Sequence, residues 1–179
     1  GYHTVFQICL DRFPIIFGFI VGSLSVEGSR HGYYHMIMLP LILLEMEQGE
    51  MSFLGLIDML SLVLVSAGIC CANFLLPKDR SRSARVSALR GMLINLNWGD
   101  YIEAAYPYME KSRVVMLGAY LGGGLGGAAA ALYQAKGTAY VPFWILLILG
   151  ENRWGCLVSM AISFTVPFFT TVTNNLINS

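Results

Sequence analysis

The chain has 179 residues, of which 56% are hydrophobic and only 12% are charged, and its formal net charge is zero. Soluble domains typically carry about 25% charged residues, so this chain has too few charges to cover a water-exposed surface. The composition favours a lipid bilayer as the solvent and excludes an ordinary soluble domain. The zero net charge by itself gives no indication of a nucleic-acid partner.

The beginning of the chain shows no targeting signal. The chain starts with Gly1 and has neither a basic n-region nor a small-residue cleavage site, so no signal peptide is predicted. We expect the chain to be a piece of a longer protein or a processed product. Its four cysteines have no metal-ligand spacing, and the adjacent Cys70 and Cys71 are expected to be buried as small hydrophobic residues.

Residues 1–76 contain two short apolar segments and one long one. Phe13–Leu24 and Tyr33–Leu44 are shorter than the roughly 20 residues that a membrane-spanning helix needs, and Pro40 interrupts the second. Phe53–Leu76 is long enough to cross a bilayer and is followed by Pro77. We predict a broken-helix element that carries His35, followed by a full span.

Residues 77–112 combine basic and acidic motifs. Nearly half of the eleven Lys and Arg residues lie in the stretch 77–90, namely Lys78, Arg80, Arg82, Arg85 and Arg90. The positive-inside rule predicts that this stretch is a cytoplasmic loop. A nucleic-acid patch is disfavoured because no aromatic residues are interleaved with the charges. The moderately apolar segment Val86–Leu96 is predicted to be re-entrant.

Residues 113–179 contain two further spans with a half-length segment between them. Val114–Tyr133 carries Gly118, Gly122 and Gly126 at four-residue intervals, beside Gly123 and Gly127, and this pattern predicts close approach of another helix. Tyr140–Leu149 is again short, and Trp154–Leu176 is the last span.

The alternation of long and short apolar segments indicates the fold class. Non-helical backbone at membrane depth is tolerated only where it is buried in protein or lines a cavity, and interrupted segments often mark a transporter's substrate site. We therefore predict an all-α integral membrane protein with transmembrane helices and re-entrant or broken half-helices. No internal repeat is evident.

The stretch Asn95–Arg113 holds the first group of candidate site residues. It contains three carboxylates, Asp100, Glu103 and Glu110, together with Trp98 and three tyrosines. Ionised groups next to apolar segments need partners or water. Aromatic rings beside carboxylates fit a membrane-interface belt, and they equally fit a sugar site, in which carboxylates bind hydroxyl groups and rings contact C–H faces.

Two histidines and an acid within a predicted span form the second group. His31 and His35 are four residues apart, but no Glu follows His31 and Gly32 weakens a helix there, so a zinc site is disfavoured. A histidine at the mouth of a broken helix, hydrogen-bonded to a polar ligand, is the better interpretation. Asp58 lies within a span and needs a partner or a hydrated cavity. No metal ligand set and no cofactor are predicted.

No nucleophile elbow, P-loop, dinucleotide fingerprint or zinc-ribbon spacing occurs in the sequence. Whether the chain contributes to an enzyme is therefore left open, because a self-contained active site is not indicated.

The stretch "YIEAAYPYMEKSRVVMLGAYLGGGLGG" resembles the membrane-embedded sugar permeases of the bacterial phosphotransferase system, the enzyme IIC components. In that family a short motif with a glutamate precedes a polar turn and a Gly-rich span. Tyr101–Tyr108 is similar to this motif and places the family glutamate on Glu103. The segment "GYYHMIMLPL" is similar to the family's histidine element and places the histidine on His35, with His31 as the second candidate.

The resemblance covers roughly Gly28–Leu176 and corresponds to the C-terminal half of a IIC domain. It implies that Glu103 and His35 bind sugar hydroxyls, with Trp98 and Asp100 shaping the wall. It also implies homodimers and a cytoplasmic IIB partner that phosphorylates the sugar. Ile102 replaces the family threonine and Ala104 replaces Gly or Pro, so Asp100 remains a competitor for the glutamate's role.

Three other functions remain open. An ion-coupled transporter or channel would use Glu103 and Asp58, and a membrane interaction protein would use the Gly118–Gly127 face for oligomerisation. A membrane enzyme with a His/Asp site is the third and weakest. We expect a multi-pass protein of the bacterial cytoplasmic membrane, in contact with lipid and without nucleic acid, that transports a sugar together with a IIB phosphocarrier.

Overall fold

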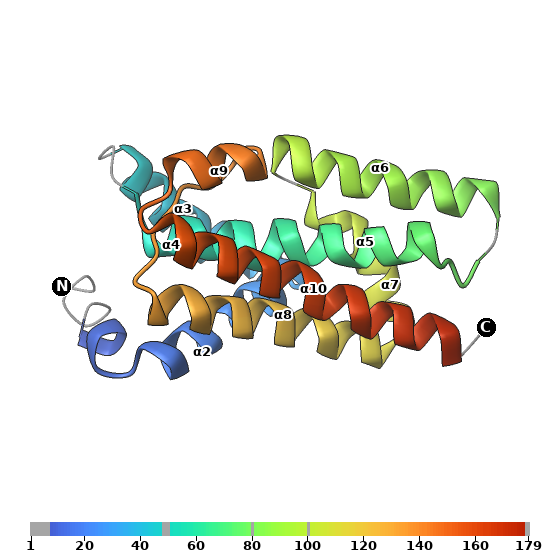
Figure 1. The fold of residues 1–179 in the computed structure, drawn as a ribbon, viewed down its shortest axis with the longest axis horizontal. Coiled ribbons are helices and arrows are strands. Elements are labelled where there is room, and N and C mark those ends of the chain that lie inside the picture. Colours follow the sequence, from blue (N-terminus) through green and yellow to red (C-terminus); the bar gives the residue numbers. More distant parts are fainter. Residues whose placement is uncertain (1–7, 48–50, 80, 100, 178–179) are drawn as a thin grey trace.

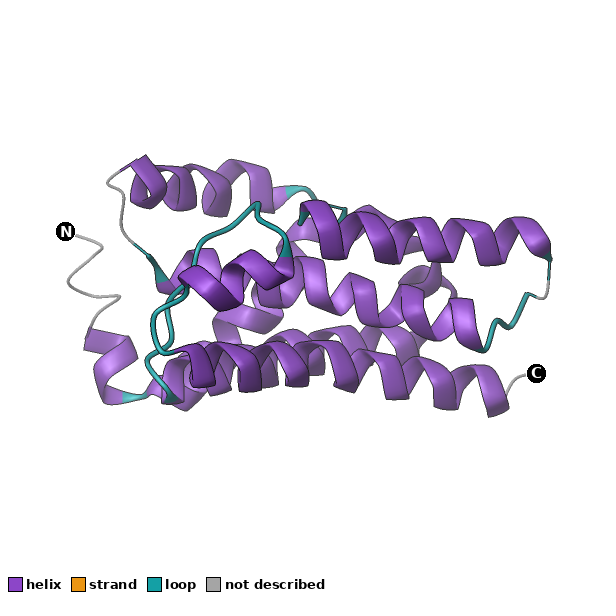
Figure 2. Cartoon of the chain, turned by 45° about the horizontal axis from the view of Figure 1, so that its top comes forward, coloured by secondary structure: helices purple, strands orange, loops and turns teal. Residues whose placement is uncertain are grey.

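A computed structural model describes residues 8–47, 51–79, 81–99 and 101–177, and describes the backbone alone at 35, 37, 41 and 44–47. Within these ranges the chain consists of helices joined by short loops (Figures 1 and 2). The β pairing in the same ranges is confined to two isolated bridges, Ser52–Gly137 and Lys136–Glu151. The prediction of an all-α fold is confirmed for the described residues.

The central element is one continuous helix made of three parts. It consists of α4 (Phe53–Asp58), the π-helix η1 (Met59–Leu64) and α5 (Val65–Leu75). The Ser52 side chain caps its first turn by accepting a hydrogen bond from Gly55 N at 2.8 Å. The most apolar 18-residue window of this helix is buried throughout. The rest of the fold is arranged around this helix (Figure 1).

Three helices are long and apolar enough to cross a membrane: Phe53–Leu75, α8 (Arg113–Leu132) and α10 (Arg153–Ile177). They match the three long apolar segments that the sequence predicts within one or two residues at each end. The helix α2 (Pro14–Arg30) is the fourth long element of the bundle and packs along α8.

Glycines on two faces of α8 bring its neighbours into close contact. On one face, a Cβ added at Gly22 of α2 would lie 2.2 Å from Gly123 O, and one added at Gly18 would lie 2.2 Å from Gly127 O. On another face, a Cβ at Gly118 would lie 1.9 Å from Thr170 Oγ1 of α10. Only hydrogen fits at these positions, so the predicted close approach of other helices is confirmed.

The basic stretch differs from the predicted cytoplasmic loop 77–90. The loop ends at Ser81, and α6 (Arg82–Trp98) runs beside α5 as a helix of 17 residues (Figure 1). Val86–Leu96, which the sequence predicts to be re-entrant, forms the inner part of this helix. The physical reason is that Ser81 caps the helix through Ala84 N at 3.2 Å. The side of α6 that carries Ala88, Gly91 and Asn95 is buried.

The remaining helices are short. They are α3 (Tyr33–Glu47), the 3₁₀ turn η2 (Ile102–Ala104), α7 (Tyr106–Lys111) and α9 (Phe143–Leu149). The short apolar segment Tyr140–Leu149 that the sequence predicts contains α9, a helix of 7 residues. The sequence predicts that Pro40 interrupts this segment, but in the structure Pro40 lies inside the continuous helix α3. A proline in a helix removes one backbone donor, and α3 continues for seven residues beyond it, to Glu47.

Candidate functional site

The chain reverses direction directly after α6. Gly99 caps α6 in the left-handed conformation with a φ of 71°, and its N–H donates to Asn95 O. A Cβ at Gly99 would lie 2.5 Å from Val141 O, so both the backbone conformation and the packing require glycine. After this turn come Tyr101, η2 and α7, and a single residue, Ser112, separates α7 from α8. The segment from Gly99 to Lys111 is here called the return segment.

Two buried polar side chains hold the start of the return segment. Asn95 Nδ2 donates to Ser66 Oγ at 2.9 Å and to Tyr101 O at 3.0 Å, while Asn95 Oδ1 accepts from Tyr101 N at 3.1 Å. Ser66 Oγ donates to Tyr101 O at 3.2 Å. Both Asn95 and Ser66 are completely buried. Hydrogen bonds in a buried setting fix geometry strongly, so α5 and α6 together determine where η2 lies.

The return segment turns one side chain inward and one outward at the predicted motif. Ile102 is buried at 5% exposure, and the next residue, Glu103, is exposed. Ala104 packs against α6, because a Cβ at Gly91 would lie 2.7 Å from the Ala104 Cβ. Glu103 is therefore presented on a fixed turn whose neighbours anchor it on both sides.

The other predicted residues of this region are less enclosed or lie outside the description. Trp98 at the end of α6 is 68% exposed and Tyr101 is 40% exposed. Asp100, the competitor for the role of Glu103, lies outside the described residues. The structure therefore places Trp98 at the end of α6 and Glu103 five residues later in η2.

A shared hydrophobic cluster joins the return segment to α3. Its buried members include Tyr34 of α3, Ile102 of η2, Leu54 of α4 and Leu62 of η1. Tyr106 of α7 and Tyr140 of the loop before α9 pack against it. The neighbours of His35 and Glu103 in the sequence are thus packed in one cluster, against the first half of the long buried helix. The His35 side chain itself lies outside the described residues.

Asp58 lies beneath this cluster with two tyrosines. Its carboxylate is 3% exposed, and the Tyr34 hydroxyl donates a hydrogen bond to Asp58 Oδ1. The Tyr140 hydroxyl lies 3.3 Å from the Tyr34 hydroxyl. Asp58 is the last residue of α4 and the π-helix begins at the next residue. Single π-helical turns inside α-helices occur frequently at functional sites.

His31 lies in a different setting from the one that the sequence predicts. It caps α2, and Gly32 follows with a φ of 80°, so His31 and His35 belong to different helices. Its Nδ1 is 3.0 Å from Glu27 Oε1, and Arg30 Nη2 also contacts Glu27 Oε1 at 3.0 Å. The Tyr120 hydroxyl donates to the same carboxylate. These contacts make His31 part of a network of polar contacts around Glu27 that joins α2 to α8.

Sequence reasoning missed the residues that hold the site in place. Asn95 and Ser66 are 29 positions apart and meet only in the folded chain. Ser29, whose hydroxyl lies 2.6 Å from that of Tyr106, connects α2 to the return segment and was missed too. Glu27 gave one local signal, since Arg30 follows it at a spacing that favours an ion pair on a helix.

No family model matches the chain, and no curated protein or solved structure matches it either.

The arrangement offers hydrogen-bonding chemistry. Exposed Glu103 and buried Asp58 provide carboxylate oxygens, and Tyr34, Tyr106 and Tyr140 provide hydroxyl groups around the same cluster. Among the described residues, no group of three or more His, Cys, Asp or Glu side chains is placed to hold a metal ion. Groups of this kind suit the binding of a polyhydroxylated ligand or the exchange of a proton.

Proposed function

We propose that the chain is the C-terminal half of a sugar permease of the phosphotransferase type, with Glu103 as the main acceptor of sugar hydroxyl groups. The observation that supports this most is the shared cluster of Tyr34, Ile102, Tyr106 and Tyr140. It packs the return segment, which bears Glu103, against α3, which bears His35. The return segment contains only the short helices η2 and α7, and short helical segments often mark a transporter's substrate site.

The chemistry of the proposed site follows from its donors and acceptors. Hydrogen bonds from sugar hydroxyls to an ionised carboxylate are stronger than neutral ones, so Glu103 supplies most of the polar binding. The exposed rings of Trp98 and Tyr101 offer flat apolar faces for the C–H groups of a sugar. In this proposal His35 and Asp100 complete the polar wall.

The proposal includes a location and an orientation. The three long apolar helices cross the bacterial cytoplasmic membrane, and the end that carries Lys78, Arg82, Arg85, Lys111 and Arg113 faces the cytoplasm. We call this the basic end. A IIB phosphocarrier would approach from this side and phosphorylate the sugar, and two copies of the permease would form a homodimer. The phosphoryl donor belongs to the partner.

Ion-coupled transport is the second candidate, and Asp58 is the observation that favours it. A carboxylate that is 3% exposed, hydrogen-bonded to Tyr34 and followed directly by a π-helix, is suited to taking up and releasing a proton. A scaffold role for the glycine faces of α8 has less support. Helices α2 and α10 of the same chain already cover them.

Transport with chemical analysis of the product tests the proposal. Membrane vesicles that contain the protein would be supplied with phosphorylated IIB and a labelled sugar, from a panel of hexoses, disaccharides and ascorbate-like acids. Accumulation of a phosphorylated sugar, lost in Glu103→Gln and kept in Glu110→Gln, supports the permease. Glu110 is a suitable control because it is also exposed and lies on the same return segment. The opposite result is accumulation of unmodified sugar that requires a pH gradient and is lost in Asp58→Asn. That result would favour the ion-coupled transporter over the permease.

A further inference from the structure

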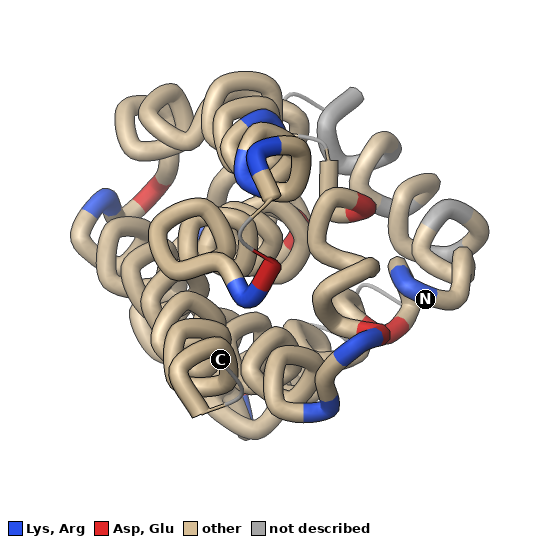
Figure 3. Tube along the Cα trace, turned by 90° about the vertical axis from the view of Figure 1, so that its right-hand side faces the viewer, with Lys and Arg blue, Asp and Glu red and all other residues tan. Residues whose placement is uncertain are grey.

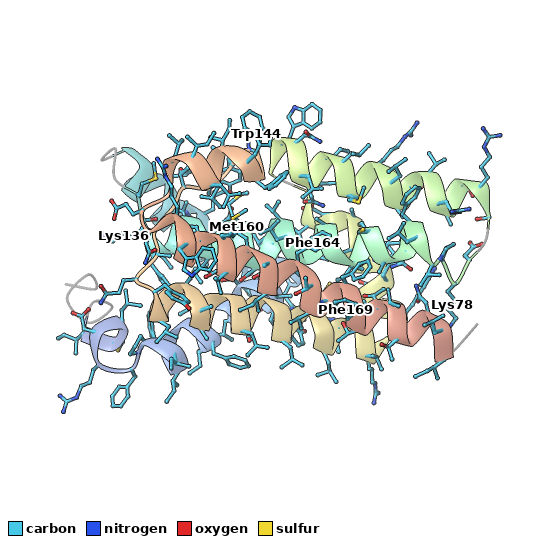
Figure 4. All side chains as sticks on the ribbon, in the orientation of Figure 1. Lys78, Lys136, Trp144, Met160, Phe164 and Phe169 are labelled. Carbon is cyan, nitrogen blue, oxygen red and sulfur yellow. The ribbon has the colours of Figure 1, made fainter. Side chains whose placement is uncertain are left out.

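A cavity lies at the basic end of the bundle, away from the cluster over Asp58. Its volume is about 470 Å³, and its lining includes Asn73 of α5, Tyr108 of α7, Ser112 and Val115 at the start of α8, and Asn174 and Asn175 of α10. Lys78, Asp79 and Lys111 complete its mouth. Figure 4 shows Lys78 at the end of the molecule where α10 terminates. Figure 3 shows basic positions on several elements when this end faces the viewer.

The charges at the mouth favour an anion. Lys78 and Lys111 both line the cavity, and within the described residues no acidic group lies within 4 Å of either ammonium group. The carboxylate of Asp79 accepts a hydrogen bond from Ser81 N at 2.9 Å, and this bond lowers the pKa of Asp79 below its ordinary value. The charge of Lys111 also lowers the pKa of Asp79, but no direct ion pair joins Asp79 to either lysine among the described residues, and two lysines against one carboxylate leave the mouth with an excess positive charge.

The floor of the cavity consists of buried amides. Asn73, Asn174 and Asn175 are 6%, 7% and 5% exposed. Asn175 Nδ2 donates to Asn73 Oδ1 at 3.1 Å, so this carbonyl oxygen already accepts one hydrogen bond within the protein. An amide NH₂ has two donors, and the Asn73 group uses one of them on Ile69 O at 2.9 Å. Asn73 lines the cavity, and within the described residues its amide nitrogen has no acceptor besides Ile69 O.

The start of α8 adds the positive end of a helix dipole, although Val115 N there already donates to Ser112 Oγ at 3.4 Å. Ser112 caps this helix of 20 residues, and its hydroxyl donates to Asn174 Oδ1 at 2.7 Å. The backbone N–H groups in the first turn of a long helix carry a partial positive charge and favour anions. Ser112 and Val115 of this turn line the cavity. The lysines, the Asn73 amide and the helix start thus surround the same space.

We propose that this cavity binds a phosphate group. The oxygens of a phosphate accept several hydrogen bonds at once, and lysine ammonium groups bind phosphate as point charges. The phosphate has two possible sources, an anionic lipid headgroup or a soluble phosphate. Basic pockets between helices at the cytoplasmic side of a membrane bind lipid headgroups, and a cavity of this volume also admits a free ion. The proposal does not depend on sugar transport.

Two binding measurements on the purified full chain distinguish the sources. In the first, orthophosphate is titrated into protein in uncharged detergent by calorimetry at constant ionic strength. In the second, native mass spectrometry counts lipid retained from nanodiscs of phosphatidylcholine with and without phosphatidylglycerol. Saturable orthophosphate binding assigns the site to a soluble phosphate. Retention of phosphatidylglycerol without orthophosphate binding assigns it to a lipid headgroup.

The variants test whether the cavity is responsible. The double variant Lys78→Gln/Lys111→Gln should weaken binding by roughly 30-fold. Each of the two lysines is expected to contribute a similar share of the electrostatic attraction to the phosphate. Lys136→Gln is the matched control. Lys136 is half-exposed at the opposite end, where it pairs with Glu151 at 3.5 Å (Figure 4), and its replacement should leave binding unchanged.

A variant that is expected to gain affinity provides a test that loss of folding cannot mimic. Asp79→Asn removes the carboxylate at the mouth and keeps an oxygen that can accept from Ser81 N, so it should tighten binding several-fold. If the double lysine variant loses helix content, Asp79→Asn alone decides. Failure of both probes to bind, equal binding by wild type and a folded double lysine variant, or unchanged binding in Asp79→Asn would each overturn the proposal.

Discussion

Two interfaces of the molecule are held together by different forces. Helix α2 lies against α8 through paired glycines, with no room for a methyl group between Gly22 and Gly123. The return segment lies against α5 and α6 through the hydrogen bonds of Asn95 and Ser66. The first interface depends on shape and the second on a few directional bonds. The glycine interface therefore builds the bundle, while the polar interface positions the turn that bears Glu103.

The two interfaces also differ in the substitutions that they tolerate. Close glycine packing tolerates no added atom, because protein interiors have little spare volume. The polar interface tolerates changes on the exposed side of the return segment, such as Glu103, as long as its buried anchors remain. A turn that is anchored by buried side chains on one side and exposed to solvent on the other is well suited to present ligand-binding groups.

The largest expected effect comes from Gly22→Val in the glycine interface. The new Cβ would lie 2.2 Å from Gly123 O, and backbone on both sides prevents relief. We expect a loss of at least about 3 kcal/mol in the free energy of unfolding, the upper end of the range for overpacked cores. Unfolding by SDS in mixed micelles would measure it.

Gly28→Ala is the matched control on the same helix. The nearest atom to its new Cβ is Tyr34 N at 3.8 Å, an ordinary contact. Alanine is favoured over glycine inside a helix, so this variant should be as stable as the wild type or slightly more stable. Equal destabilisation by both variants would contradict the account of the glycine interface.

The next largest effect is expected from Asn95→Leu in the polar interface. Leucine leaves Tyr101 N without its acceptor and removes the donor to Ser66 Oγ. Each buried polar group left without a partner costs about 1–3 kcal/mol, so we expect a total of about 3 kcal/mol. Asn97→Leu serves as control, because Asn97 is exposed and bonds only to Leu93 O among the described residues. If Asn95→Leu lowered the free energy of unfolding by less than about 0.5 kcal/mol, packing alone would hold the turn.

A smaller loss is expected from Tyr34→Phe beneath the return segment. The change removes the hydroxyl that donates to buried Asp58 and keeps the ring in its cluster. Hydrogen bonds to charged groups contribute about 1.5–3 kcal/mol, so unfolding should become easier by about 2 kcal/mol in the same SDS assay. Tyr33→Phe at the neighbouring position, where the ring is 61% exposed, should have no measurable effect. Similar values for the two variants would argue against a structural role of the Tyr34–Asp58 bond.

The smallest effect on stability is expected from Glu103→Gln. The side chain is exposed on η2, while its neighbours Ile102 and Ala105 are buried. Surface substitutions away from special features usually change stability by less than about 0.5 kcal/mol. A larger loss in thermal or SDS unfolding would assign Glu103 a structural role in the turn.

The sequence allowed the bundle to be predicted better than the site. The three long helices and the glycine faces of α8 follow from apolar length and four-residue spacing, which are local patterns. Helix α6 escaped prediction because its exposed arginines obscure a narrow buried side of Ala88, Gly91 and Asn95. Pro40 inside α3 was misinterpreted as a helix end, although proline also occurs inside helices that neighbouring groups support.

The anchors of the site could not be predicted, since they join distant parts of the chain. Asn95 meets Ser66 across 29 positions and Tyr34 meets Asp58 across 24. Neither pair has a sequence pattern of its own. The π-helix after Asp58 is a property of the packed bundle, and no residue in "MLSLVL" distinguishes it from an ordinary α-helix.

The central claim is that Glu103 binds a sugar from a turn fixed by the protein core. Calorimetric titration of the sugar panel into purified protein, with wild type, Glu103→Gln and Glu110→Gln side by side, tests it most directly. The account predicts saturable binding of one sugar to wild type and Glu110→Gln, and at least a tenfold weaker affinity in Glu103→Gln with unchanged unfolding. Binding that survives unchanged in Glu103→Gln, or no binding of any sugar by the folded wild-type protein, would contradict it.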